Sequence, residues 1–331
     1  MTTIDHRTQR PVSAAGCTET GLWKAASDRW CIVVADDHGP EWAPTCSSGE
    51  RQSPAQYSRL GESSTLLHRA LCRALRLAPA SQVLLTALEE YREHWEPSAW
   101  CLKPEHRFIC DHRAASLLTG AAALLSISSK DPSAVVTILP ARCYVAHEWV
   151  LSAALDLAIA RLPHIAEGVL TLGMIDAIES LDEDYLVATR AQSDRSLTAL
   201  GFARRPAYGV ATHLREQGAL IASGIMIGYA GAFAAHISKH WPGLTLQLLN
   251  LLNAAAGANV ECEIPANLPR GVPKPVICSL RWQPPCFTQR VFRVRGCGWS
   301  GLKSAQAVAR VSGYLATARF AEFSMATGEG A

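Results

Sequence analysis

The sequence lacks an excess of charge of either sign. Its 331 residues include 31 lysines and arginines and 29 aspartates and glutamates, which gives a formal net charge of +2. A chain balanced in this way has no overall electrostatic attraction to DNA or to an anionic membrane surface. We therefore expect no DNA partner and no membrane partner, and any site for an anionic ligand must be local.

Internal repeats, low-complexity tracts and a recognisable targeting segment are also absent from the sequence. Residues 1–28 lack the apolar centre of a signal peptide and predict a flexible leader. The uncharged segment from Gly218 to Ala235 contains several glycines and predicts a buried strand that runs into a helix, not a membrane span. The 11 cysteines lack the close, regular spacing of a disulfide framework, which favours reduced thiols and a cytoplasmic protein.

Apolar β-branched runs alternate with longer helical patterns along the chain, and 49% of the residues are hydrophobic. This alternation is typical of βαβ units, so we predict an α/β fold with a mostly parallel central sheet. The expected strands are 30–35, 82–86, 134–139, 168–172, 223–228 and 290–295, the expected helices are 64–77, 114–129, 145–162, 229–240, 244–256 and 303–320, and the Pro-rich segment 264–285 is expected to be a loop. In such sheets ligands bind beyond the carboxyl ends of the strands, here after Ala35, Thr86, Leu139 and Leu172.

Five short motifs occur in an order that belongs to one known family. They are "SPAQY" at 53–57, "VTILPARCYV" at 136–145, Phe202 to Pro206, Ser223 with Gly224, and Gly298 to Ser300. In that order they are similar to the "PKQF", "LPSDHYV", "FxEKP", "WNSG" and "GWSDWG" motifs of the sugar-1-phosphate nucleotidyltransferases. The segment from Trp30 to Phe320 resembles most closely the mannose-1-phosphate guanylyltransferases.

The resemblance implies a Rossmann-like, GT-A type nucleotidyltransferase fold in three layers. It also implies one domain at 29–325, with a nucleotide-side half at about 29–175 and a sugar-side half at about 176–325. In this family a sugar phosphate attacks the α-phosphorus of a nucleoside triphosphate, pyrophosphate leaves, and Mg²⁺ neutralises the developing charge.

The residues that would perform this chemistry are mostly replaced. Only Gly39 remains of the glycine-rich phosphate loop, and Ala55 replaces the lysine of "PKQF". Arg142 replaces the metal-binding aspartate of "LPSDHYV", and Gly301 replaces that of "GWSDWG". The glycine-rich phosphate loop, the lysine and both metal-binding aspartates are lost together. We therefore predict no catalytic residues, no metal site and no cofactor.

The remaining positions of the cleft define a candidate binding site. Arg142, Arg204 and Arg205 replace an acidic residue, a glutamate and a lysine of the family motifs, and arginine can bind phosphate without a metal. The nucleotide-side positions are Asp36, Asp37, His38, Gly39, Gln56, Arg113, Arg142, Arg204 and Arg205, and the sugar-side positions are Ser223, Gly224 and Trp299.

Four hypotheses remain open at this point. The first is a pseudoenzyme that senses a guanine nucleotide or cyclic di-GMP and regulates GDP-mannose and exopolysaccharide supply. The second is an active, Mg²⁺-dependent guanylyltransferase with rearranged ligands from Asp36, Asp37, Asp182 and Asp184. The third is a structural subunit with an active homologue as its protein partner, and the fourth is a decayed cleft with solvated arginines. The sequence does not fix the oligomeric state.

Two further patterns carry weaker signals. Cys101, His106, Cys110 and His112 have a spacing that fits no common structural zinc site. Arginines at 290, 293 and 295 alternate with apolar residues in a predicted strand, which indicates a basic sheet face that is most simply a solvated one.

Overall fold

The computed structural model describes residues 29–35, 54–60, 64–111, 116–165, 168–175, 183–190, 197–265 and 290–327. The predicted leader 1–28 and the predicted loop 266–285 lie outside these residues, as do Asp36 to Gly39, His112, Arg113 and Asp182.

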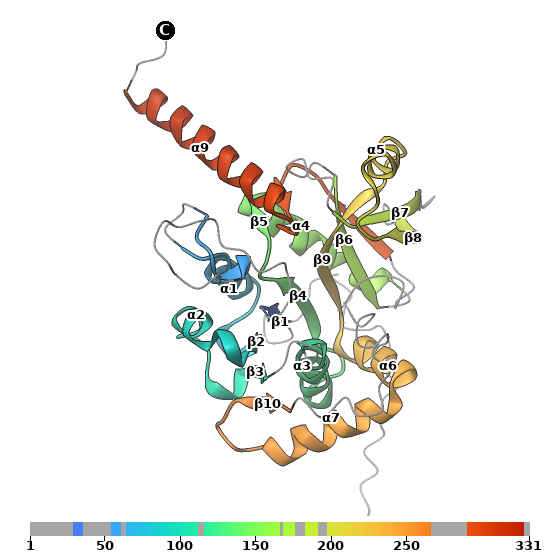
Figure 1. Cartoon of the computed structure of the whole chain (residues 1–331). Coiled ribbons are helices and arrows are strands. Elements are labelled where there is room, and N and C mark those ends of the chain that lie inside the picture. The colour runs from blue at the N-terminus through green and yellow to red at the C-terminus, as the bar shows by residue number, and fades with distance from the viewer. Residues whose placement is uncertain are drawn as a thin grey trace, which may run out of the picture.

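A ten-stranded mixed sheet forms the centre of the fold (Figure 1). The strand order is β10-β3-β2-β1-β4-β9-β6-β11-β8-β7, and all of these strands run in the same direction except β9 and β8. Their bounds are β1 Arg29–Val34, β2 Val83–Leu88, β3 Arg107–Cys110, β4 Val135–Pro140, β6 Val169–Met174, β7 Tyr185–Arg190, β8 Leu197–Ala203, β9 Leu220–Tyr229, β10 Cys262–Ile264 and β11 Arg290–Val294. A separate antiparallel pair joins β5, Tyr144–Val145, to β12, Trp299–Ser300.

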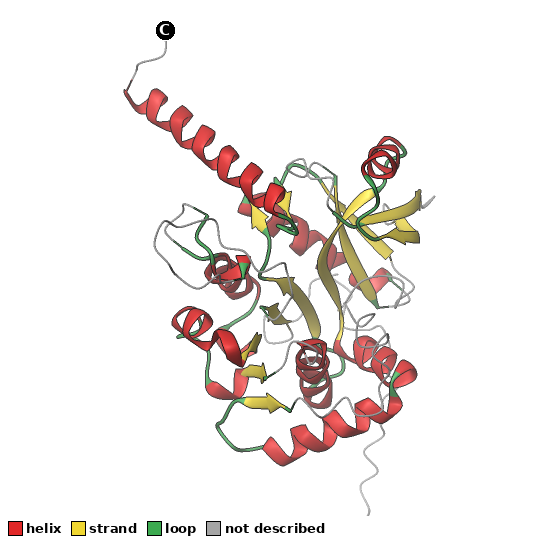
Figure 2. Cartoon of the chain, in the orientation of Figure 1, coloured by secondary structure: helices red, strands yellow, loops and turns green. Residues whose placement is uncertain are grey.

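Helices cover both faces of the sheet, which confirms the predicted α/β fold in three layers (Figure 2). The helices are α1 Leu66–Leu77, α2 Arg92–Trp95, α3 Ser116–Lys130, α4 Glu148–Arg161, α5 Tyr208–Glu216, α6 Ala230–His240, α7 Pro242–Ala255 and α9 Ala305–Thr327. One apolar core lies between the sheet and helices α1 and α4, and a second lies between the opposite face and helices α3, α6 and α7.

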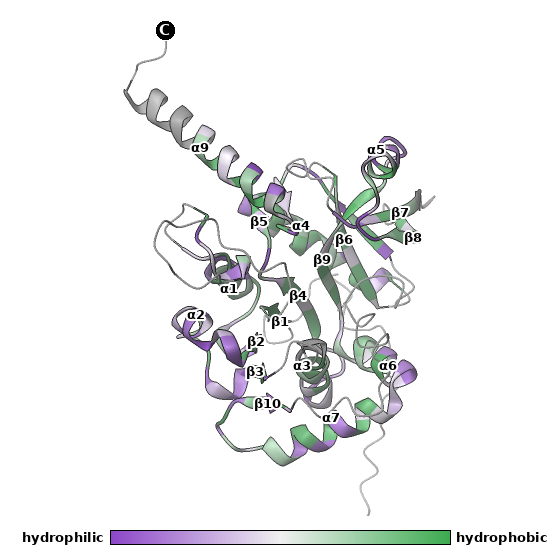
Figure 3. Ribbon diagram, viewed as in Figure 1, coloured by the Kyte–Doolittle hydropathy of each residue, from purple (hydrophilic) through white to green (hydrophobic). Residues whose placement is uncertain are grey.

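Strand β1 shows how the sequence produces these layers. Cys31 and Val33 belong to the first core, while Ile32 belongs to the second, because successive side chains of a strand point to opposite faces. All three are buried, so the part of the strand that has helices on both sides is apolar. Figure 3 shows the same apolar character along the neighbouring central strands β4, β6 and β9.

The predicted elements that fall on described residues form, with shifts of a few residues at their ends. The segment from Gly218 to Ala235 becomes β9 and the beginning of α6, as predicted, and no helix among the described residues is long and apolar enough to cross a membrane. Strands β3, β5, β7, β8, β10 and β12 and helices α2 and α5 were not predicted, and Ile264, at which the predicted loop starts, is the last residue of β10. Helix α9 continues past its predicted end to Thr327.

Candidate functional site

Arg142 follows strand β4, and its guanidinium group lies against the segment after β12. Its Nη1 atom donates a hydrogen bond to the carbonyl oxygen of Leu302 over 3.4 Å, and only 5% of the residue is exposed. The fold therefore brings position 142 next to Gly301. At both positions the resemblance implies a metal-binding aspartate. Position 142 instead has the guanidinium group of an arginine, and position 301 is a glycine with no side chain.

The space beside Gly301 is filled by the carboxylate of Glu183. The backbone N–H of Gly301 donates to Oε1 of Glu183 over 3.0 Å. A Cβ atom built on Gly301 would lie 2.8 Å from Oε2 of Glu183 and 2.8 Å from Cη2 of Trp299. Because no real Cβ packs so closely, an aspartate cannot be accommodated at 301 unless Glu183 moves.

Lys303 neutralises the acidic groups of this cluster. Its Nζ atom lies 2.7 Å from Oδ2 of Asp184 and 3.4 Å from Oε2 of Glu183. The other oxygen of Asp184, Oδ1, accepts a hydrogen bond of 3.0 Å from the backbone N–H of Arg205. Glu183 is 0% exposed and Asp184 is 2% exposed, so both carboxylates rely on these donors in place of water.

Burial raises the pKa of Glu183 above its ordinary value of 4.5. The nearby Lys303 ammonium group and the N–H of Gly301 act in the opposite direction, since both favour the ionised carboxylate. The balance of these effects favours the protonated carboxyl group over the carboxylate.

We tested whether Arg142, Glu183, Asp184 and Lys303 fit the Mg²⁺ ion that the resemblance implies. Mg²⁺ needs oxygen ligands in octahedral geometry and usually keeps several waters. Here an ammonium group lies between the two carboxylates and a buried guanidinium group occupies position 142. Among the described residues no group of three or more His, Cys, Asp or Glu side chains could hold a metal. The four residues do not fit a magnesium ion.

Gln56 lies under the end of β1 and is buried. Its Nε2 atom donates to the carbonyl oxygen of Ala35 over 2.9 Å, and the hydroxyl group of Tyr57 donates to the same oxygen over 3.1 Å. These two bonds hold the "SPAQY" turn against the point at which the chain leaves the sheet. The side-chain amide of Gln56 therefore stabilises the backbone at the end of β1.

The three sugar-side positions are buried or half-buried parts of the framework. Ser223 donates through Oγ to the carbonyl oxygen of Leu172 over 2.6 Å and accepts from the N–H of Ile225 over 3.0 Å. Gly224 has a φ of +77°, which suits the irregular pairing of β9 with β6 that follows Thr171. Trp299 is 1% exposed and pairs with Val145 between β12 and β5.

The three arginines of the predicted nucleotide site do not share one environment. Arg142 is buried, whereas Arg204 and Arg205 are exposed in the turn between β8 and α5. Arg205 has an unusual positive φ of 38°, and its N–H is the group that reaches Asp184. Arg205 therefore contacts the buried Asp184 through its backbone N–H group and not through its guanidinium group.

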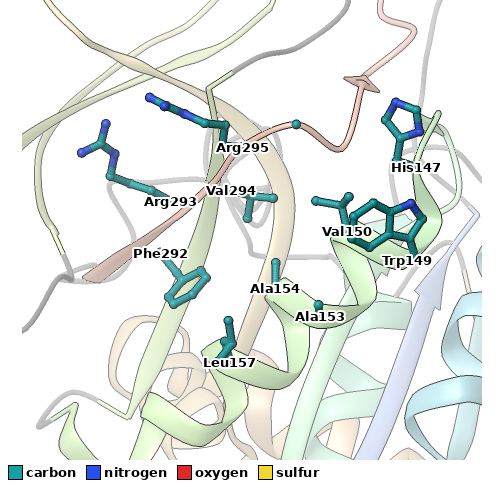
Figure 4. Close-up of a pocket in the computed structure, with 11 residues that line it drawn as sticks. His147, Trp149, Val150, Ala153, Ala154, Leu157, Phe292, Arg293, Val294 and Arg295 are labelled. Atoms are coloured by element: carbon teal, nitrogen blue, oxygen red, sulfur yellow. The ribbon is translucent and has the colours of Figure 1, made fainter.

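An apolar groove lies between helix α4 and strand β11 (Figure 4). Phe292 and Val294 point toward the helix, where Leu157 is 61% exposed, and Arg293 and Arg295 point away from it. The side chains at 293 and 295 therefore share a basic sheet face, while Arg290 belongs to the opposite face by strand alternation. The predicted basic face was wrong in including Arg290, whose Nη1 donates to Oγ1 of Thr198.

The weak zinc pattern has ordinary packing roles where it is described. The ring of His106 is hydrogen bonded through Nδ1 to the carbonyl oxygen of Ala80 at 3.2 Å, and the thiol of Cys110 points to the carbonyl oxygen of Ala87. Burial lowers the pKa of His106 and so favours its neutral form.

The sequence motifs do not indicate Glu183 or Lys303. Neither lies in a matched motif, and they are 120 positions apart with no pattern that indicates a contact. Asp184, in contrast, was nominated as a metal ligand for the catalytic alternative, and the structure pairs it with Lys303.

Comparison with known proteins supports the fold. No protein-family model and no curated protein matches the sequence. The crystal structure of mannose-1-phosphate geranyltransferase from Thermus thermophilus superposes with a TM-score of 0.61 and 21% identity over 85% of this chain and 78% of that chain. Mannose-6-phosphate isomerase from Helicobacter pylori gives a TM-score of 0.58 and 14% identity over 82% of this chain and 99% of that one. The chain shares the Rossmann-like α/β fold of these two structures.

Proposed function

We propose that this chain is a non-catalytic relative of the sugar-1-phosphate nucleotidyltransferases, a pseudoenzyme that keeps the fold as a regulatory, ligand-binding scaffold. The candidate ligands are a guanine nucleotide or cyclic di-GMP, and the regulated process is the supply of GDP-mannose for exopolysaccharide. One observation carries the proposal: Lys303 lies between the buried carboxylates of Asp184 and Glu183.

The physical argument is electrostatic. Nucleotidyl transfer needs a divalent cation to neutralise charge that develops between two anionic reactants. At implied metal position 142 this chain has a guanidinium group that is hydrogen bonded to Leu302, and beside position 301 the ammonium group of Lys303 is already paired with Asp184. Replacing Lys303 by a metal would require the ammonium group to leave a site that is only 10% exposed.

A pyrophosphate-exchange assay with GTP, mannose 1-phosphate and Mg²⁺ tests the loss of catalysis. We expect no exchange above that of a buffer control. Exchange that disappears when EDTA is added would overturn the proposal, because it would require a working metal site.

Calorimetric titration tests the ligand-binding part separately. GTP, GDP-mannose and cyclic di-GMP should be titrated into the full chain with and without Mg²⁺, and at least one should bind equally well in both conditions. If none releases heat or raises the melting temperature, the scaffold does not sense these nucleotides.

The active guanylyltransferase remains the alternative, and one observation favours it. Glu183 places a carboxylate beside Gly301, where the resemblance implies an aspartate. If Lys303 moved away, Glu183 and Asp184 would be two oxygen ligands. The exchange assay separates this alternative from the proposal.

A further inference from the structure

A cavity of about 550 Å³ lies beside helix α5 and shares no residue with the cluster of Arg142, Glu183, Asp184 and Lys303. Three arginines are among its lining residues: Arg215 of α5, Arg293 of β11 and Arg310 of α9. These elements are far apart in the sequence, so the fold brings the three charges together. The other lining residues are Ile175, Tyr208, Thr212, Glu216, Gly218, Ala219, Leu220 and Ile221.

The charge of this cavity is unbalanced. Glu216 supplies the one carboxylate among its described lining residues, and Arg215 and Arg293 outnumber it without counting Arg310. Within the described part of the chain, no carboxylate lies within ion-pair distance of Arg215 or Arg293. A concave surface lined by cationic side chains concentrates anions, so the arrangement favours an anionic ligand.

The residues that line the cavity indicate which class of anion it could bind. Guanidinium groups bind the oxygens of phosphate in pairs, and a phosphate monoester has three terminal oxygens that can face several such groups. Leu220 and Ile221 add an apolar wall, and Tyr208, which is 72% exposed, adds an aromatic ring at the rim. A cavity of this size suits a small organic molecule, whereas inorganic phosphate would fill little of it.

We propose that the cavity between α5, β11 and α9 binds a phosphate monoester of a small organic molecule, with the phosphate group held by Arg215, Arg293 and Arg310 and the organic part against Tyr208 and Leu220. This is a second site, separate from the implied catalytic cleft. It does not depend on whether the cleft binds nucleotide.

Isothermal titration of the full chain in buffer with EDTA tests the proposal. The probes are GMP, mannose 1-phosphate and inorganic phosphate. We expect at least one of the two esters to bind more tightly than inorganic phosphate. Arg293→Ala and Arg215→Ala should each weaken ester binding by about tenfold or more, the effect of losing one charge-assisted contact.

Matched variants separate this site from others. Arg76→Ala removes an exposed arginine at the end of α1 and should leave binding unchanged. Lys303→Met alters the cleft and should also leave binding unchanged. Circular dichroism melts should show that Arg215→Ala and Arg293→Ala fold, since both side chains are exposed. The same melts set the temperature at which Lys303→Met, which removes a buried charge, is still folded, and its binding is measured below that temperature.

Three results would overturn the proposal: neither ester binds, inorganic phosphate binds as tightly as both esters, or both arginine variants keep the affinity of the unchanged protein. Loss of binding in Lys303→Met without loss in Arg293→Ala would place the ligand in the cleft. Pyrophosphate exchange would refute the proposed loss of catalysis and leave this second site intact.

Discussion

The Nζ atom of Lys303 lies 2.7 Å from Oδ2 of Asp184, in surroundings that exclude nearly all water from both side chains. Removing the ammonium group by Lys303→Met would leave two buried carboxylates without their cation, and breaking a buried pair in this way costs about 3–5 kcal/mol of unfolding free energy. Urea denaturation at neutral pH measures this loss. Mg²⁺ should stabilise the variant more than the unchanged protein, since it can take the vacated position.

A conservative variant provides the control for this prediction. Lys303→Arg keeps the positive charge and should lose less stability than Lys303→Met, although its larger head group fits less well. If Lys303→Met unfolds at the same urea concentration as the unchanged protein, the ammonium group does not neutralise the cluster.

Gly301→Ala should destabilise the protein by about 1–3 kcal/mol, because the new methyl group would overpack the site. Its Cβ atom would lie 2.8 Å from Oε2 of Glu183 and from Cη2 of Trp299. Thermal unfolding of Gly313→Ala is the matched control, since a Cβ at that helical glycine has open space within 4 Å. The control should be neutral or slightly stabilising. Equal effects of the two variants would show that Gly301 is not crowded by Glu183.

The ion pair of Arg73 with Glu148 should stabilise the junction of α1 and α4. Nε and Nη2 of Arg73 donate to the two carboxylate oxygens over 2.9 Å and 2.7 Å, and the arginine side chain is 3% exposed. We expect Glu148→Ala to cost about 3–5 kcal/mol, because it leaves a buried guanidinium group with no carboxylate facing it.

The exposed pair of Arg29 with Asp156 is the comparison for this prediction, with side chains that are 27% and 59% exposed. Asp156→Ala should cost about 0–1 kcal/mol, as is typical of surface pairs. Denaturant titrations of the two alanine variants should therefore differ clearly. Similar losses would argue against the importance of the buried pair.

Stability should fall as the pH rises from 4.5, because of Glu183. Burial raises the pKa of its carboxyl group above the ordinary value of 4.5 that applies in the unfolded chain. Between these two pKa values the unfolded state has lost the proton and the folded state still holds it, so each increase in pH favours unfolding. Glu183→Gln cannot ionise and lacks this contribution.

The measurement is the difference in unfolding free energy between the unchanged protein and Glu183→Gln across this pH range. We expect the variant to gain relative stability as the pH rises above 4.5. A difference that stays constant with pH would mean that Glu183 has the same pKa in both states.

The central layers of the fold could be predicted from the sequence because their residues are buried on both sides. Strands β1 and β4 are apolar runs, and helix α3 is apolar almost all round, so the pattern alone identified them. Strand β8 and helix α5 were missed because they lie at the edge of the molecule, where Leu200 and Tyr208 are exposed and the periodicity is weak.

The candidate site could be predicted only where a motif marks it. Arg142 and Gly301 were identified through the resemblance, and in the structure Arg142 is hydrogen bonded to Leu302, the residue that follows Gly301. The contact of Glu183 with Lys303 depends on the pairing of β7 with its neighbours and on the turn after β12, which no local pattern encodes. The clustering of Arg215, Arg293 and Arg310 could not be predicted for the same reason.

A crystal grown with GTP, mannose 1-phosphate and Mn²⁺ tests the central claim most directly, since manganese scatters anomalously and substitutes for magnesium. We predict no anomalous peak within coordination distance of Glu183 or Asp184, with Lys303 still bonded to Asp184. A manganese ion bound to either carboxylate and to the triphosphate would contradict the account.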